Sequence, residues 1–234
     1  MCKLVSMILT KKKVYFLSGN DSHEEIIEKF KLKEYVKNKI NFVRVEITPN
    51  KETTDFFDWS EEALSRWTYK VDQDILPDWY VGEYDEKRTR EYLPIVLKER
   101  FKDNIWNGDL DFSNTNITEL PADLQVNGGL DLRNTNITEL PAGLRVSWSL
   151  YLRDTKITEL PAGLHVGGSL YLSNTKIIEL PAGLHVGGSL YLSNTNITEL
   201  PADLQVGGDL ILRNTKITKL PADLYVKGDI YKDF

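Results

Sequence analysis

Residues 170–189 read LYLSNTKIIELPAGLHVGGS, and residues 190–209 read LYLSNTNITELPADLQVGGD. The same order of leucines, turn residues, isoleucine and Leu-Pro returns every 20 residues from position 110 to position 229, in six copies, and a seventh copy starts at Ile230. A unit this short cannot bury its own apolar side chains. Stacked neighbours share a continuous core, so the repeat predicts a solenoid.

Each copy predicts a short strand, two corners and a row of inward side chains. In the copy at 170–189, the alternation over 170–172 is typical of a strand that points two residues inward. Asn174 and Thr175 follow as a turn pair able to hydrogen-bond nearby backbone, and Pro181 excludes a continuous helix or a central strand. We therefore expect the threonine hydroxyl to lie inside the turn.

The spacing L-x-L-x-x-T-x-I-x-x-L-P-x-x-L over residues 110–229 resembles the short 20-residue "LPX" leucine-rich repeats of secreted bacterial effectors. The resemblance implies a leucine-rich-repeat solenoid of six repeats. Two features depart from the family: threonine stands at the ladder position that is usually asparagine, and a valine stands four residues before each leading leucine. These departures keep an alternative open, a β-solenoid with two strands per coil.

Residues 1–109 lack the repeat and predict an α/β domain that caps the solenoid, which occupies residues 110–234. A capping box at Ser22 and Glu25 begins a helix, and apolar residues at helical spacing predict a second helix over 85–101. Alternating apolar stretches predict strands over 14–17, 42–47 and 67–71.

Three stretches of this half, at 16–23, 41–49 and 70–80, resemble an N-terminal module of phage and prophage proteins that precedes repeat arrays. The resemblance implies a viral origin and brings no catalytic residues with it. The ubiquitin-ligase activity of some effectors relies on a cysteine in a helical domain after the repeats, and Cys2 cannot take that role.

Composition and charge argue against several classes of function. Lys and Arg number 29 against 35 Asp and Glu, a formal net charge of -6, so we expect no wide basic surface for duplex nucleic acid. The single cysteine excludes an intramolecular disulfide and a zinc site built on several thiolates. No segment approaches the roughly 18 apolar residues of a membrane span, and the start lacks the pattern of a secretory signal. We expect a cytoplasmic protein, in the host cytoplasm if a phage encodes it.

The sequence predicts no catalytic residue, no metal site and no cofactor, so we expect a protein that is not an enzyme. His23 lies beside the helix cap and is interpreted as a surface residue of the first turn. The acidic stretch over 72–78 lacks the glycine and closing glutamate of a calcium loop and is interpreted as a solvated loop. His165 and His185 share one position in adjacent repeats, but zinc usually takes at least three protein ligands.

The outward residues of the short strands vary from copy to copy and predict an interaction surface. A central row of tyrosines lies between arginines and two aspartates, and Tyr and Arg are enriched at hot spots of protein interfaces. We expect these rows on the concave sheet face. The predicted partner-binding residues are Asp111, Asp131, Arg133, Tyr151, Arg153, Tyr171, Tyr191 and Arg213.

A second column is an alternative contact face, because a glutamate recurs nine residues after the leading leucine in five of the six copies. Its members are Glu119, Glu139, Glu159, Glu179 and Glu199, and Lys219 ends the column.

A third expectation concerns the last coil, whose open strand edge and apolar residues favour a homodimer through the C-terminal end of the solenoid.

These observations together predict a non-enzymatic protein–protein interaction scaffold that binds a partner through the repeat surface. The phage resemblance implies a bacterial host protein as the target, such as an anti-phage defence component to be inhibited. Two other classes stay open: an enzyme or nucleic-acid-acting domain within residues 1–109 that the repeats target, and a structural or assembly protein.

Overall fold

The computed structural model describes residues 5–17, 22–33, 35–36, 39–49, 56 and 58–233. The chain divides into two compact units, Met1–Lys102 and Asp103–Phe234. The division falls before residue 109, because strand β8 (Ile105–Trp106) already pairs with the solenoid strand β10 (Gln125–Val126). Among the described residues, no helix combines the length and the apolar character that crossing a membrane requires.

The first unit is built on a four-stranded antiparallel sheet in the order β2-β1-β5-β6. Its central strands pair along their length, from Val5 opposite Ile47 to Thr10 opposite Phe42. The strands are β1 (Val5–Thr10), β2 (Val14–Tyr15), β5 (Phe42–Thr48) and β6 (Thr68–Val71). A separate ribbon pairs β3 (Tyr35–Val36) with β4 (Lys39–Ile40), and β7 (Phe101–Lys102) ends the unit.

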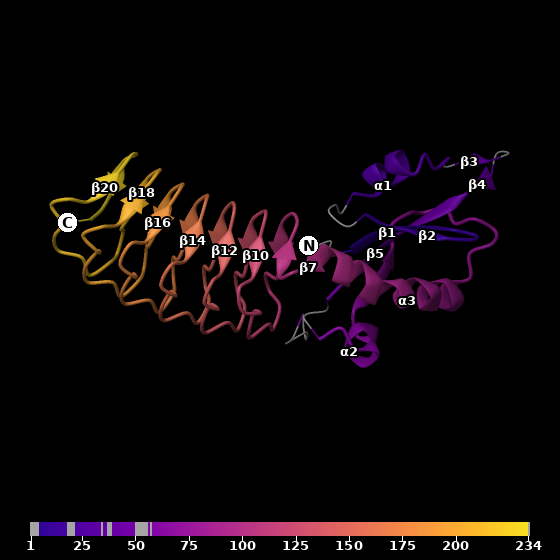
Figure 1. Ribbon diagram of the computed structural model, residues 1–234, viewed down its shortest axis with the longest axis horizontal. Coiled ribbons are helices and arrows are strands. Elements are labelled where there is room, and N and C mark those ends of the chain that lie inside the picture. The colour runs from indigo at the N-terminus through magenta and orange to yellow at the C-terminus, as the bar shows by residue number, and fades with distance from the viewer. Residues whose placement is uncertain are drawn as a thin grey trace. The chain divides into compact units, whose positions relative to one another are not determined.

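Helices cover both faces of this sheet, with α1 on one side and α3 on the other (Figure 1). A buried cluster of Ile8, Ile26 and Phe42 attaches α1 to β1 and β5. The helices are α1 (His23–Lys29), α2 (Glu61–Ser65) and α3 (Gly82–Arg100). The predicted capping box is confirmed in part, because the Ser22 hydroxyl accepts a hydrogen bond from the Glu25 amide at 3.4 Å.

The second unit is a β-solenoid of about six turns, each 20 residues long, with two short strands per turn. All pairing between turns is parallel and joins each residue to the one 20 positions later, as in Leu170 opposite Leu190. The first solenoid sheet contains β8, β10, β12 (Arg145–Val146), β14 (His165–Val166), β16 (His185–Val186), β18 (Gln205–Val206) and β20 (Tyr225–Val226). The second contains β9 (Leu110–Asp111), β11 (Leu130–Asp131), β13 (Leu150–Tyr151), β15 (Leu170–Tyr171), β17 (Leu190–Tyr191), β19 (Leu210–Ile211) and β21 (Ile230–Tyr231).

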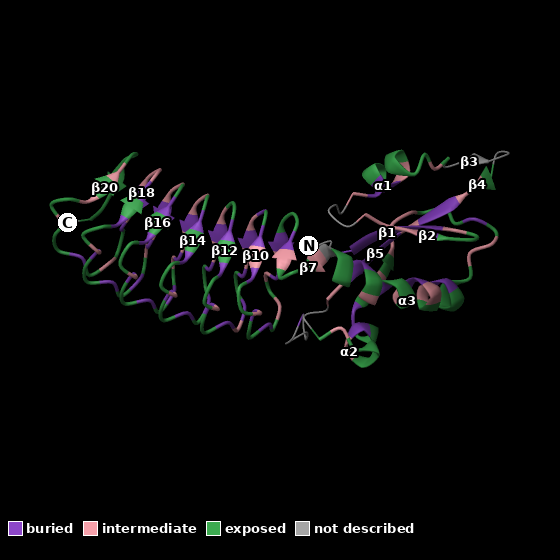
Figure 2. Ribbon diagram, viewed as in Figure 1, coloured by how far each residue is buried: buried purple, intermediate pink, exposed green. Residues whose placement is uncertain are grey.

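Buried and exposed segments alternate along each turn of the solenoid (Figure 2). The buried residues are apolar and recur at the same positions in successive turns, so they form continuous apolar columns. Leu170, Ile177 and Val186 of one turn are each 0% exposed. Turns also approach one another closely: a Cβ added at Gly187 would lie 2.1 Å from the carbonyl oxygen of Gly167. This contact accounts for glycine at this corner in the three copies that have it, at positions 167, 187 and 207.

In the second solenoid sheet, the corners after β9 to β19 share one backbone construction, with Asp154 in place of the asparagine in one turn. Asn174 takes a left-handed backbone conformation with φ of 61°, a conformation that asparagine tolerates better than most residues. Its side chain accepts a hydrogen bond from Asn194 at 2.8 Å, in the next turn. The Thr175 hydroxyl is buried and donates to the Leu172 carbonyl at 2.7 Å. The predicted position of the threonine inside the turn is therefore confirmed.

The sequence predicted the solenoid and the preceding α/β unit correctly, with a leucine-rich-repeat cross-section as the first expectation and a two-strand-per-coil β-solenoid as the alternative. Of the two cross-sections, the structure has the two-strand-per-coil β-solenoid. The short α2 was missed, because five residues are too few to show helical periodicity. The long helix begins three residues earlier than predicted and continues through Pro94.

Candidate functional site

The predicted partner-binding residues lie on the outward side of the second solenoid sheet, which we call the tyrosine face. Each strand there points its leucine inward and its second residue outward. Tyr151, Tyr171 and Tyr191 are half-buried and stack in a column, with ring centroids 4.6 and 4.4 Å apart and ring planes within 12° of parallel. Burial raises the pKa of the Tyr171 hydroxyl, and its two tyrosine neighbours add to the shift.

Charged residues of the tyrosine face partly pair with one another. Arg133 donates from Nε and Nη2 to both carboxylate oxygens of Asp131, at 2.5 to 3.0 Å, and these hydrogen bonds raise the pKa of Arg133. The same guanidinium lies 5.5 Å from the centroid of the Tyr151 ring. Arg153 instead contacts Asp154 at 3.1 Å. The structure thus brings the first two aspartates, Arg133 and the tyrosines together, and it turns Arg153 toward the adjacent corner.

Trp148 is a residue of this face that the sequence prediction missed. It lies at the corner before β13 and is 65% exposed, the most exposed tryptophan of the described chain. Other copies have glycine at this position, so the single break in the repeat was the available signal. Trp148 borders a cavity of about 330 Å³. The lining residues are Asp109, Leu110, Asp111, Gly129, Asp131, Trp148, Ser149 and Tyr151.

The glutamate column and the two repeat histidines lie elsewhere on the solenoid surface. All five glutamates of the column are exposed, as predicted. His165 and His185 are opposite one another in β14 and β16, and both are exposed. This arrangement agrees with the interpretation of both columns as solvent-facing rows.

His23 is not a surface residue, so that interpretation was wrong. Its side chain is 5% exposed, and Nε2 lies 3.0 Å from the Val45 carbonyl oxygen of β5. Position in the first turn of α1 predicts exposure from local structure alone, but α1 packs on the sheet and turns this residue inward. The neighbouring acidic stretch also divides: Asp74 and Asp78 are exposed, as expected, whereas Asp72 is partly buried beside His23.

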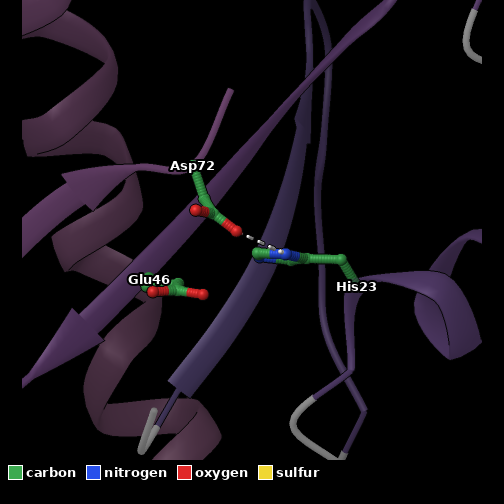
Figure 3. Close-up of side chains that lie close together, drawn as sticks. All are labelled: His23, Glu46 and Asp72. Atoms are coloured by element: carbon green, nitrogen blue, oxygen red, sulfur yellow. Dashed lines mark ion pairs between the residues drawn. The ribbon is translucent and has the colours of Figure 1, made fainter. Parts of the chain in front are cut away.

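Three potential ligand side chains meet at this point (Figure 3). His23 comes from the start of α1, Glu46 from the middle of β5, and Asp72 from the residue after β6. One ligand atom from each lies within 4.8 Å of the others, and His23 Nδ1 is 3.7 Å from Asp72 Oδ2. Lys70 Nζ lies 3.3 Å from Asp72 Oδ1 and 4.0 Å from Glu46 Oε2. The sequence prediction missed this cluster because the three residues are far apart in the chain.

A groove of about 580 Å³ lies between α2 and α3. Arg90 crosses the groove, donating to Glu86 at 2.7 Å and to the carbonyls of Leu64 and Trp67 at 3.0 and 2.8 Å. These contacts attach α3 to the segment that contains α2. We therefore interpret the groove as a packing feature of the first unit.

Comparisons with known proteins add no assignment to this geometry. No protein-family model matches the chain, and no curated protein matches its sequence. What is established is architectural: an antiparallel sheet with helices, followed by a β-solenoid of about six 20-residue turns.

Proposed function

We propose that the protein is a non-enzymatic scaffold that binds a protein partner through the tyrosine face of the solenoid. The observation that carries the proposal is a column of three stacked tyrosines, Tyr151, Tyr171 and Tyr191, on the second solenoid sheet. The exposed Trp148 lines a cavity beside the first of them. Tryptophan, tyrosine and arginine dominate the binding energy of protein interfaces, and this face carries all three.

The stacking of the tyrosines suits them to binding. Side chains held in one conformation before binding lose less entropy when a partner docks, by about 0.5–1.5 kcal/mol for each side chain that would otherwise be immobilised. Tyr171 is held between rings on both sides at 4.6 and 4.4 Å, so its ring is already ordered. The structural alternative is that the stack only stabilises the sheet. That alternative gives no reason for an exposed tryptophan where the other turns have glycine.

The cavity beside Trp148 indicates the chemistry of the partner. Asp109 and Asp111 give it negative charge, since Asp131 is already paired with Arg133, and Trp148 and Tyr151 give it aromatic walls. A basic side chain fits such a site, because it can pair with a carboxylate and lie against an aromatic ring. The Tyr151 ring already contacts a guanidinium, that of Arg133. We infer that the partner inserts an arginine or lysine here.

The proposal about the target is supported by the resemblance of the sequence to phage-type modules and effector-type repeats. Proteins of those two kinds act inside or upon a cell that is not their own source. We therefore propose that a phage encodes the chain and that it binds a bacterial host protein, such as a component of anti-phage defence, and blocks it.

Capture from bacterial lysate with matched variants tests the proposal. Trp148→Gly is the informative variant, since it restores the residue found in the other turns and should leave the fold intact. We expect Trp148→Gly, and separately Tyr171→Ala combined with Tyr191→Ala, to lose the protein that the wild-type chain retains. The control changes the other face, with Glu159→Lys and Glu179→Lys together, and should retain it. Loss only in the glutamate variant would assign binding to the glutamate column and overturn the tyrosine face.

A further inference from the structure

The cluster of His23, Glu46 and Asp72 in the first unit lies outside the solenoid and plays no part in the proposed binding function. We propose that it is a binding site for a divalent transition-metal ion, with zinc as the ion that its donors fit. One imidazole nitrogen and two carboxylates form a mixed set of nitrogen and oxygen donors. Zinc binds such a set, whereas magnesium and calcium prefer ligands that are all oxygen.

The hydrogen bond of His23 fixes which nitrogen faces the cluster. A carbonyl oxygen can only accept, so the Nε2 that lies 3.0 Å from the Val45 oxygen must carry the proton. In the neutral imidazole, Nδ1 then presents its lone pair to the two carboxylates. A histidine that donates its other N–H to a backbone carbonyl is the arrangement that orients metal-bound imidazoles. The ring is 5% exposed, so packing holds this orientation.

The distance between the His23 and Asp72 ligand atoms is close to the one expected around a bound ion. Ligand atoms about 2.1 Å from a tetrahedral zinc ion are about 3.4 Å apart. His23 Nδ1 and Asp72 Oδ2 are 3.7 Å apart, and all three ligand atoms lie within 4.8 Å of one another. Glu46 is 5% exposed and Asp72 is 34% exposed, so the site opens toward solvent on the Asp72 side. Three protein ligands leave a fourth position for water.

Lys70 competes with an ion at this site. Its ammonium group contacts Asp72 at 3.3 Å and lies 4.0 Å from Glu46, so it offsets part of the negative charge that would attract a cation. The lysine side chain is 56% exposed, and it can turn into solvent when an ion binds. This competition makes a prediction of opposite sign to the ligand variants: removing the lysine should strengthen zinc binding.

The experiment uses the full chain in a background that removes the other soft ligands. Three histidines and one cysteine are present, so Cys2→Ser, His165→Gln and His185→Gln leave His23 as the single imidazole. Calorimetric titration with zinc should show one site per chain. In nitrogen-15 NMR spectra, the His23 Nδ1 resonance should shift until one equivalent of zinc is added, while magnesium should leave it in place.

Ligand variants in this background decide the assignment. Glu46→Gln and Asp72→Asn should each weaken zinc binding by more than about tenfold, since even the loss of an outer hydrogen-bond partner costs that much. Circular dichroism checks that the two ligand variants fold. Lys70→Gln changes an exposed residue and should bind zinc more tightly than the background protein. Three results would each overturn the proposal. They are a His23 resonance that zinc does not move, zinc binding that neither ligand variant changes, and weaker zinc binding by Lys70→Gln.

Discussion

Replacing Thr175 with valine tests the construction of the solenoid corner. The Thr175 hydroxyl is 4% exposed and donates to the Leu172 carbonyl at 2.7 Å. Valine has nearly the same shape and a higher preference for β structure, so a loss of stability can be assigned to the hydrogen bond. Equivalent bonds at 2.7 Å recur in neighbouring turns, at Thr155 and Thr195.

The size of the effect follows from what the Leu172 carbonyl retains. Removing one partner of a buried hydrogen bond costs about 1–3 kcal/mol. The Thr175 amide also donates to this carbonyl, at 3.2 Å, so the oxygen keeps a partner in the variant. We therefore expect a cost of about 1–2 kcal/mol, in the lower part of that range. With a urea dependence of about 2 kcal/mol per molar, the midpoint of solenoid unfolding should fall by about 0.5–1 M.

Hydrogen–deuterium exchange of solenoid peptides at increasing urea separates this unit from the first one. The control is Thr198→Val, the same change at an exposed position where the preceding turn already has Ile178. The control should lie within about 0.5 kcal/mol of the wild type. Equal midpoints for Thr175→Val and Thr198→Val would refute the role assigned to the buried hydroxyl.

Three further predictions concern packing, association and pH. Gly187→Ala should destabilise the solenoid by about 1–3 kcal/mol in thermal melts, because the added Cβ would meet the Gly167 carbonyl. The control, Gly82→Ala, places its Cβ in open space and should be neutral or stabilising. Light scattering should give a dimer mass for the 234-residue chain, because Ile230 and Tyr231 in the last turn are 38% and 41% exposed. A monomer mass at tens of micromolar would contradict this prediction. Burial raises the pKa of Tyr171, so the stability that the neutral tyrosine contributes is complete below about pH 10 and is lost as the pH rises further. The urea midpoint of the wild type should therefore fall in alkali, and that of Tyr171→Phe should fall less.

The repeat predicts most of the solenoid because each rule is applied six times in register. The 20-residue period, Pro181 and the Asn174–Thr175 pair set the turn length, the corner and the buried hydroxyl, and parallel pairing of identical turns then places the tyrosines in one column. The cross-section could not be predicted, because a two-residue strand such as β14 is too short for alternation to distinguish it from a loop.

The candidate sites were harder to predict because they depend on single residues or on long-range packing. Trp148 breaks a column of glycines, and that departure was visible in the sequence without an indication of which way the side chain points. His23 is buried through contact with the Val45 carbonyl, 22 residues away in the chain, and no local pattern reports such a contact. Asp72 and Glu46 join it only because β5 and β6 are neighbours in the sheet.

Site-specific photocrosslinking in bacterial cells tests most directly whether the tyrosine face binds the partner. Benzoylphenylalanine is placed at Trp148 in one chain and at Ile178 in another; the two side chains are 65% and 59% exposed, and Ile178 lies next to the glutamate column. The proposed function predicts that the chain labelled at position 148 forms one discrete adduct with a host protein and that the chain labelled at position 178 forms none. An adduct at position 178 without one at position 148 would contradict it.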